Sequence, residues 1–194
     1  MIALEGGEGS GKSTQAAILA RSLGAALARE PGGTASGERI RALLLDPALS
    51  HLQPRAEVLL MLAARAQHVE EVIAPALASG RDVVCDRFSA STVTYQGHGR
   101  GLDLAELARL STWASGGVEP DRVVLLQVTA AVAAARRAAR TGHDRIEGEG
   151  AEFFSRVEAG FAAMAAADPA RWRVVDGAGS VDEVAALVLA AARA

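Results

Sequence analysis

The chain has 194 residues, half of them hydrophobic, with a formal net charge of −3 and one cysteine. This length predicts one domain spanning residues 1–194. The slight negative charge gives no indication of a nucleic acid or a membrane surface as a partner, and no apolar run reaches the length of a membrane span. Because Cys85 is alone and cannot form an internal disulfide, we expect a cytoplasmic location.

The first predicted elements are a strand, a glycine-rich loop and a helix. Residues 1–4 form a short apolar run, which is typical of a buried strand. Residues 6–13 follow the pattern G-x-x-x-x-G-K-S, the signature of a phosphate-binding P-loop. Residues 12–23 have apolar side chains at helical spacing. The loop therefore leads from a strand to a helix N-terminus, where the helix dipole favours an anion.

This loop supplies the residues that we expect to bind ATP. Lys12, the only lysine of the chain, can reach the β- and γ-phosphates, and the Ser13 hydroxyl is a ligand for Mg²⁺. A compact ammonium on a flexible stem suits this task better than a planar guanidinium. The alternative is a glycine-rich turn that binds nothing. The predicted ATP-binding residues are Gly6, Gly7, Glu8, Gly9, Ser10, Gly11, Lys12 and Ser13.

Strands and helices alternate along the rest of the chain. The predicted strands cover residues 25–28, 82–85, 122–128 and 172–175. The predicted helices cover residues 37–45, 54–78, 104–114, 130–141, 152–167 and 181–192. We expect Pro75 to bend or split the longest of them. This alternation predicts an α/β fold with a parallel sheet covered on both faces, whose ligands bind at the carboxyl edge of the strands.

A carboxylate and a set of polar side chains follow the predicted strand 82–85. Asp86 comes directly after it and is therefore a candidate to bind metal together with Ser13; the alternative is a capping role for the next segment. If residues 87–95 are helical, the four-residue spacing of Arg87, Ser91 and Tyr95 places them on one face. Tyr95 is either part of the pocket or core filler.

Arginines elsewhere supply candidate partners for phosphates and a base. Four of them flank the segment Gly142-His143-Asp144: Arg136, Arg137, Arg140 and Arg145. They are either a solvated helix face, or they accompany a mobile lid at about residues 141–150 that brings an arginine onto the phosphates. Arg65, with Met61 four residues before it, could hydrogen-bond a base from the middle of its helix.

Together, these segments resemble those of bacterial thymidylate kinases over nearly the whole chain. The segments that carry the resemblance are the P-loop, Arg29-Glu30-Pro31-Gly32-Gly33-Thr34, Arg65-Ala66-Gln67-His68-Val69, Asp86-Arg87-Phe88, residues 91–97 (STVTYQG) and Asp144-Arg145-Ile146-Glu147. The resemblance implies a P-loop NTPase-type three-layer α/β/α sandwich with a five-stranded parallel sheet and an arginine-bearing lid. It also implies a homodimer that transfers phosphate from ATP to dTMP with Mg²⁺.

The resemblance also implies a role for each matching residue. Lys12 would hold the ATP phosphates, and Ser13 with Asp86 would organise Mg²⁺. Arg87 and Arg41 would bind the dTMP phosphate, and Glu8 the sugar hydroxyl. The implied dTMP-binding residues are Glu8, Arg41, Met61, Arg65, Arg87, Ser91, Thr92 and Tyr95, where Arg65 hydrogen-bonds thymine, Ser91 and Thr92 lie near it, and Tyr95 crowds the sugar 2′ position.

Two departures from the family's pattern bear on these roles. Met61 stands where the family usually has a phenylalanine that stacks on thymine; a sulfur–aromatic contact can replace that stacking. In one branch of the family an arginine sits within the P-loop, but here Gly9 follows Glu8. The catalytic arginine should then come from the lid, with Arg140 and Arg145 as candidates beside Lys12, Asp86 and Arg87.

Two other classes of function remain open at this point. The first is another small kinase, acting on a different nucleoside monophosphate or on a deoxynucleoside. The second is a nucleotide-gated binding protein with little turnover. The intact Lys12, Ser13 and Asp86 count against the second class, and so does the arginine-rich lid. A switch also needs no acceptor pocket.

Overall fold

A computed structural model describes residues 1–139 and 144–194 of the chain. Its strands form one parallel sheet in the order β2-β3-β1-β4-β5. They are β1 (Ile2–Glu5), β2 (Ala26–Arg29), β3 (Val83–Asp86), β4 (Arg122–Gln127) and β5 (Trp172–Asp176). Each boundary lies within one residue of its prediction, because the apolar runs that form the strands end at polar residues.

Most helices of the described residues match the predicted helical segments, but residues 47–49 and 89–99 are helical as well, whereas no helix was predicted for the first and only a conditional one, over 87–95, for the second. They are α1 (Lys12–Leu23), α2 (Ala35–Leu45), α3 (Pro54–His68), α4 (Ala74–Ala78), α5 (Ser89–Thr92), α6 (Leu104–Ala114), α7 (Ala130–Ala138), α8 (Ala151–Ala167) and α9 (Val181–Arg193), with a short 3₁₀ helix η1 (Pro47–Leu49). The bounds of α1 and α6 agree with prediction at both ends. α7 ends at Ala138, earlier than the predicted end at residue 141, which itself lies outside the described residues.

The long helix is split near Pro75, as predicted. α3 runs into a π-helical segment, η2 (Val69–Ile73), and α4 then continues with Pro75 in its first turn. A proline has no N–H and its ring collides with the carbonyl one turn back. A wider π turn directly before it relieves that collision and keeps the chain helical.

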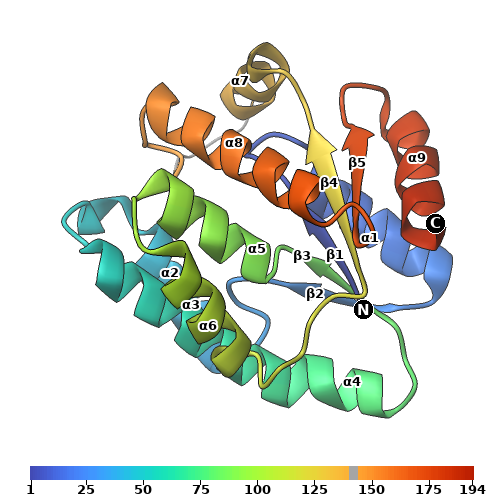
Figure 1. Cartoon of the computed structure of the whole chain (residues 1–194), viewed down its shortest axis with the longest axis horizontal. Coiled ribbons are helices and arrows are strands. Elements are labelled where there is room, and N and C mark those ends of the chain that lie inside the picture. Colours follow the sequence, from blue (N-terminus) through green and yellow to red (C-terminus); the bar gives the residue numbers. More distant parts are fainter. Residues whose placement is uncertain (140–143) are drawn as a thin grey trace.

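The sheet lies between two layers of helices (Figure 1). Because strand side chains alternate between faces, Leu4, Val84 and Val124 pack toward α1 and α9, which lie side by side. Their neighbours Ala3 and Cys85 belong to the core on the other face, with α8 and η2. This arrangement is the predicted three-layer α/β/α sandwich, and it buries Cys85 as a small apolar residue.

The parallel strands bring several chemically important segments to one edge of the sheet. β1 ends at the P-loop, β3 at Asp86, and β2 at the turn that begins with Glu30.

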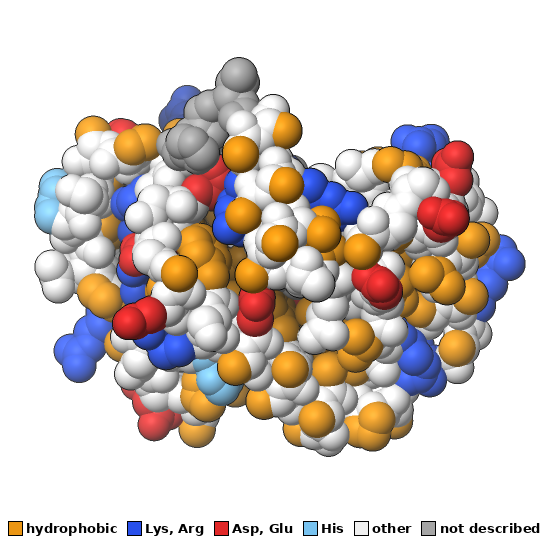
Figure 2. Space-filling model, turned by 90° about the horizontal axis from the view of Figure 1, so that it is seen from above, with side chains coloured by type: hydrophobic (Ala, Val, Ile, Leu, Met, Phe, Trp, Pro, Cys, Tyr) orange, Lys and Arg blue, Asp and Glu red, His pale blue; other side chains and the backbone are white. Residues whose placement is uncertain are grey.

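Figure 2 shows a face on which basic and acidic side chains of the described residues are interspersed with apolar ones. Among the described residues, no helix combines the length and hydropathy needed to cross a bilayer.

Candidate active site

The P-loop backbone takes a shape that glycine alone permits. Gly6 has a φ of 142°, and a Cβ atom there would lie 2.3 Å from the Leu126 carbonyl oxygen. Gly11 has a φ of 92° and occupies the N-cap position of α1, where it has no side chain to cap the helix. The N–H groups of the first turn are therefore available to an anionic ligand.

Lys12 is held inside this loop. Its ammonium lies 2.6 Å from the Gly7 carbonyl oxygen and 3.2 Å from Ser10 Oγ, and the side chain is buried. Burial, followed by repulsion from Arg87, lowers the pKa of Lys12 to about 8. The ammonium therefore sits in a low-dielectric site where an incoming polyphosphate would stabilise its charge.

Ser13 and Asp86 meet at the end of β3, as predicted. Ser13 Oγ donates a hydrogen bond to Asp86 Oδ2. The other carboxylate oxygen, Oδ1, is buried without a hydrogen-bond partner among the described residues. A buried oxygen of this kind normally has a partner. The pair thus offers a hydroxyl and a free carboxylate oxygen, a donor set that suits Mg²⁺.

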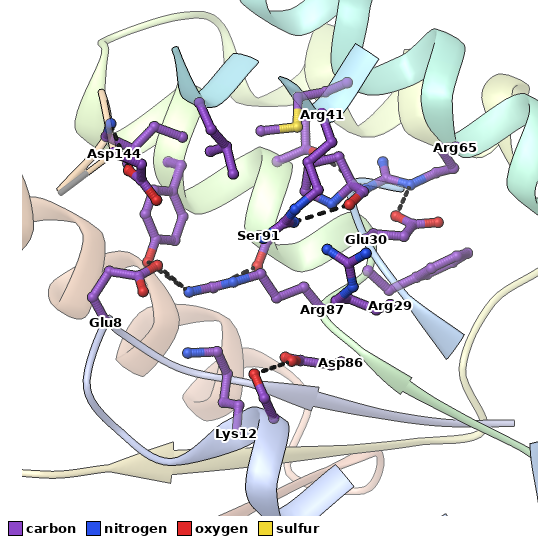
Figure 3. A pocket seen from close by; sticks show the side chains of 18 of the residues that line it. Glu8, Lys12, Arg29, Glu30, Arg41, Arg65, Asp86, Arg87, Ser91 and Asp144 are labelled. Atoms are coloured by element: carbon purple, nitrogen blue, oxygen red, sulfur yellow. Dashed lines mark hydrogen bonds and ion pairs between the residues drawn. The ribbon is translucent and has the colours of Figure 1, made fainter. Parts of the chain in front are cut away.

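Arg87 lies at the centre of the site (Figure 3). Its Nη1 donates to Ser91 Oγ at 3.1 Å and to the Gly6 carbonyl at 3.0 Å, and its Nη2 donates to Tyr95 Oη at 3.1 Å and forms an ion pair with Glu8. The predicted meeting of Arg87, Ser91 and Tyr95 is confirmed. The helix begins only at Ser89, however, and Arg87 itself has a φ of 69°, a strained conformation for a non-glycine residue.

Arg65 is also at the cavity, but its guanidinium is already engaged. Nε donates to Glu30 Oε2 at 2.8 Å and Nη2 to Thr92 Oγ1 at 3.1 Å, and the group stacks 5.1 Å from the centre of the Phe88 ring. Glu30, which also contacts His68, was not among the predicted site residues. The Glu30 carboxylate fixes the orientation of Arg65, so Arg65 presents a fixed edge to the cavity.

A single cavity of about 150 Å³ connects the P-loop to these arginines. Arg41 reaches it from α2 and donates to the Pro31 carbonyl at 3.0 Å, and Met61 reaches it from α3. All the residues predicted to bind dTMP line this cavity: Glu8, Arg41, Met61, Arg65, Arg87, Ser91, Thr92 and Tyr95. Lys12, Ser13 and Asp86 line it too, so the donor and acceptor segments face one space.

Glu5 does not line the cavity but holds Ser91, which does, and it was not among the predicted residues. Its carboxylate is fully buried at the end of β1 and accepts hydrogen bonds from Ser91 Oγ at 2.6 Å and from the Phe88 N–H at 2.8 Å. Burial raises the pKa of Glu5 against the opposing effect of the Ser91 hydrogen bond. The signal that could have identified Glu5 is its position: a charged residue ends an otherwise apolar strand, directly before the P-loop.

Arg145 does not lie where it was predicted. The expected position was over the phosphates, but its Nη2 donates to Glu57 Oε2 at 2.6 Å and its Nε to the Leu44 carbonyl at 2.9 Å. The side chain is buried, and a buried carboxylate holds a guanidinium strongly. Arg140, the other candidate catalytic arginine, lies outside the described residues.

Two arginines of α7 lie against the P-loop instead. Arg136 donates to the Gly177 carbonyl at 2.9 Å and to the Gly9 carbonyl at 3.3 Å. Arg137 donates to the Glu8 carbonyl at 3.4 Å and stacks over the Phe154 ring. The helix that precedes the predicted lid is therefore attached to the phosphate-binding loop.

Comparisons with known proteins agree with this geometry. The family model described as thymidylate kinase matches residues 4–188. The chain is 48% identical to a thymidylate kinase of Solidesulfovibrio magneticus over 199 residues, with 96% of this chain and 95% of the relative covered. It is 50% identical to one of Synechococcus sp. strain JA-3-3Ab, with 96% and 92% covered.

The chain belongs to the thymidylate kinase family. A crystal structure of thymidylate kinase from Ehrlichia chaffeensis superposes with a TM-score of 0.81 at 31% sequence identity, covering 97% of this chain and 96% of that one. The family therefore accounts for the parallel five-stranded sheet and the P-loop, and it makes the chain a phosphotransferase.

Proposed function

We propose that the chain transfers the γ-phosphoryl group of ATP to dTMP, giving ADP and dTDP for the supply of dTTP to DNA synthesis. The observation that carries this proposal is the single cavity lined both by Lys12 of the P-loop and by Arg87. In-line transfer requires the donor and acceptor phosphates to lie end to end in one water-poor space. Membership of the thymidylate kinase family supports dTMP as the acceptor.

In this proposal the P-loop binds the donor. The first-turn N–H groups of α1 and the Lys12 ammonium hold the phosphates of ATP. Lys12 would leave the Gly7 carbonyl, a weak neutral partner, for the charged β- and γ-oxygens. Its charge then balances the negative charge that develops during transfer.

Ser13 and Asp86 would hold Mg²⁺. The unpartnered Asp86 Oδ1 supports this assignment, because a cation or its water would satisfy that oxygen. Within residues 1–139 and 144–194, no group of three or more His, Cys, Asp or Glu side chains could hold a metal by itself. Mg²⁺ takes most of its ligands from phosphates and water, so in the proposed complex the ATP phosphates would supply further ligands. When bound, the ion neutralises phosphate charge during transfer.

Arg87 and Arg41 would bind the acceptor phosphate. Arg87 has one edge anchored on Ser91 and Gly6 and another paired with Glu8. A phosphate can replace Glu8 on that second edge, and the released carboxylate can then accept the sugar hydroxyl. The anchored edge keeps the guanidinium in place during the exchange.

The rest of the cavity would select the nucleoside. Arg65 and Thr92 offer polar groups to thymine, and Met61 supplies an apolar contact to its face. Tyr95 stays a neutral phenol, since burial raises its pKa, and it would crowd the sugar 2′ position. Arg140 stays the predicted catalytic arginine of the lid.

We also propose that the protein is a cytoplasmic homodimer and that each chain forms a single catalytic domain. Two neighbouring helices, α3 and α6, expose large apolar side chains: Leu59 is 64% exposed and Trp113 is 78% exposed. Trp113 supports this proposal, because aromatic side chains are enriched in surfaces that another subunit covers. The buried free Cys85 fits a reducing compartment.

The experiment that tests the function separates transfer from binding. Lys12→Ala should lower turnover of dTMP with ATP by about 100-fold or more, whereas calorimetry should give an affinity for dTMP within about threefold of wild type, because Arg87 is intact. Arg21→Ala, an exposed change on the same helix, is the control. If the wild-type chain transfers phosphate to no monophosphate, the proposal fails and a nucleotide-gated binding protein is favoured.

A further inference from the structure

A buried carboxylate outside the predicted site joins three segments of the chain. Glu57, in the first turn of α3, is inaccessible to solvent. It accepts hydrogen bonds from Gln96 Nε2 at 2.7 Å, Arg100 Nη2 at 3.1 Å and Arg145 Nη2 at 2.6 Å. Arg100 also forms an ion pair with Glu149. We call these five residues the Glu57 cluster.

The Glu57 cluster holds buried charges that must be paired with one another. Burial alone would raise the pKa of Glu57, but the hydrogen bonds from Gln96 and Arg100 hold that pKa below its usual value. The carboxylate is therefore charged at neutral pH and, together with Glu149, balances the charges of Arg100 and Arg145. Removing one member of a buried ion pair leaves an uncompensated charge, so the chain must rearrange around it. The geometry of the cluster is thus strongly determined.

Arg145 attaches the segment 144–147 to this cluster. Besides Glu57, its Nε contacts the Leu44 carbonyl and its backbone N–H donates to the Leu45 carbonyl at 3.1 Å. Arg145 therefore points away from the cavity. Its neighbours Asp144, Ile146 and Glu147 line the cavity. The four-residue segment 144–147 is therefore anchored through Arg145 and forms part of the cavity wall through its other three residues.

We propose that Glu57 is a positioning residue for the phosphoryl acceptor, acting through Arg145 to hold segment 144–147 as one wall of the acceptor side of the cavity. This inference rests on the proposed function, since it takes the cavity lined by Arg87 and Arg41 as the acceptor site. Arg145 then serves the shape of the acceptor site and does not contact the transferred phosphoryl group.

This role has a kinetic signature that a role in the transition state lacks. A displaced wall weakens acceptor binding, so the KM for dTMP rises. The P-loop does not touch the Glu57 cluster in the described contacts, so the KM for ATP should not change. A residue that stabilises the transition state would instead lower kcat at saturating dTMP.

The test is a double-mutant cycle with Glu57→Gln, Arg145→Met and the double variant, measured by steady-state kinetics with both substrates varied. Each single change should raise the KM for dTMP by about tenfold or more, with kcat and the KM for ATP within about threefold of wild type. Because both changes break one connection, the double variant should be no worse than the worse single variant.

The matched control is Arg156→Met. Arg156, an exposed residue of α8, donates to the Gly99 carbonyl at 2.8 Å, so its loss removes an arginine contact with a backbone carbonyl without touching Glu57. Its KM for dTMP should stay within about twofold of wild type. If Glu57→Gln does not fold, Arg145→Met still decides the matter, because it leaves Glu57 paired with Arg100.

Three results would overturn the inference. They are a fall in kcat of about 100-fold for Arg145→Met with an unchanged KM, additive effects in the double variant, and variants that lose thermal stability alone. The comparison uses whichever monophosphate the wild-type chain phosphorylates best. A wrong acceptor in the proposed function would therefore change the substrate of the assay and leave this test intact.

Discussion

Lys12 carries a charge whose loss should be visible in the pH dependence of ATP use. Its pKa of about 8 in the ligand-free chain means that the ammonium deprotonates in a range where the enzyme can be assayed. A neutral amine attracts phosphates less, so kcat/KM for ATP should fall as pH rises above about 8, since this ratio reports free-enzyme pKa values.

The same experiment contains its own control. The acceptor phosphate is assigned to Arg87, a guanidinium that stays protonated throughout this range. At saturating ATP, kcat/KM for dTMP should therefore stay level between about pH 7.5 and 9.5. A flat ATP profile over that range would show that Lys12 does not titrate there, and the environment described for it would be wrong.

The sequence identified contacts between residues that are close along the chain. The four-residue spacing of Arg87, Ser91 and Tyr95 predicted their meeting, and the P-loop pattern predicted the place of Lys12. Glu5 and Glu57 were missed because their partners lie far away in sequence, and periodicity carries no information about such pairs. Arg145 was misplaced for the same reason, since only the fold brings Glu57 to it.

Among the secondary-structure elements, Glu5 joins β1 to α5. The loss of stability in a Glu5→Ala variant should show how much this connection contributes to the fold. Glu5→Ala leaves the Phe88 N–H, the Ser91 N–H and the Ser91 hydroxyl without their acceptor. Each buried unsatisfied group costs about 1–3 kcal/mol. We expect the free energy of unfolding, measured with urea, to fall by about 3 kcal/mol or more.

A helix cap provides the comparison for that change. Asp103 accepts a hydrogen bond from the Glu106 N–H at the start of α6, and Asp103→Ala should cost only about 1 kcal/mol. Equal losses for the two variants would mean that the buried carboxylate contributes no more than an exposed cap, contrary to the contacts described for it.

Regular elements were predictable, whereas local deviations from them were not. α1 ends at Gly24 and α6 begins after Asp103, both of which are strong local boundary signals. The segment that follows α5 is instead a π-helix, η3 (Val93–Gly99). Tertiary contacts favour that wider turn, which places Tyr95 at Arg87 and Gln96 at Glu57. Propensity and spacing do not distinguish it from an α-helix.

At the scale of the whole molecule, the proposed dimer predicts a change of mass on mutation. In Figure 1, α3 and α6 lie on the side of the molecule away from α9. Sedimentation equilibrium should give about twice the 19.9 kDa chain mass for the wild type. Leu59→Glu on α3 should yield monomers. Leu187→Glu introduces the same charge at an exposed leucine of α9 and should leave the dimer intact. A monomeric wild type would contradict the dimer.

In the proposed reaction, this cavity takes dTMP as the acceptor of a phosphoryl group from ATP. The most direct measurement follows product formation by anion-exchange chromatography with ATP, Mg²⁺ and, separately, dTMP, dCMP, dGMP, UMP and thymidine. We expect one dTDP and one ADP per turnover, with kcat/KM for dTMP at least about tenfold above every other acceptor. An equal or higher value for any other acceptor, or no dTDP at all, would contradict the account.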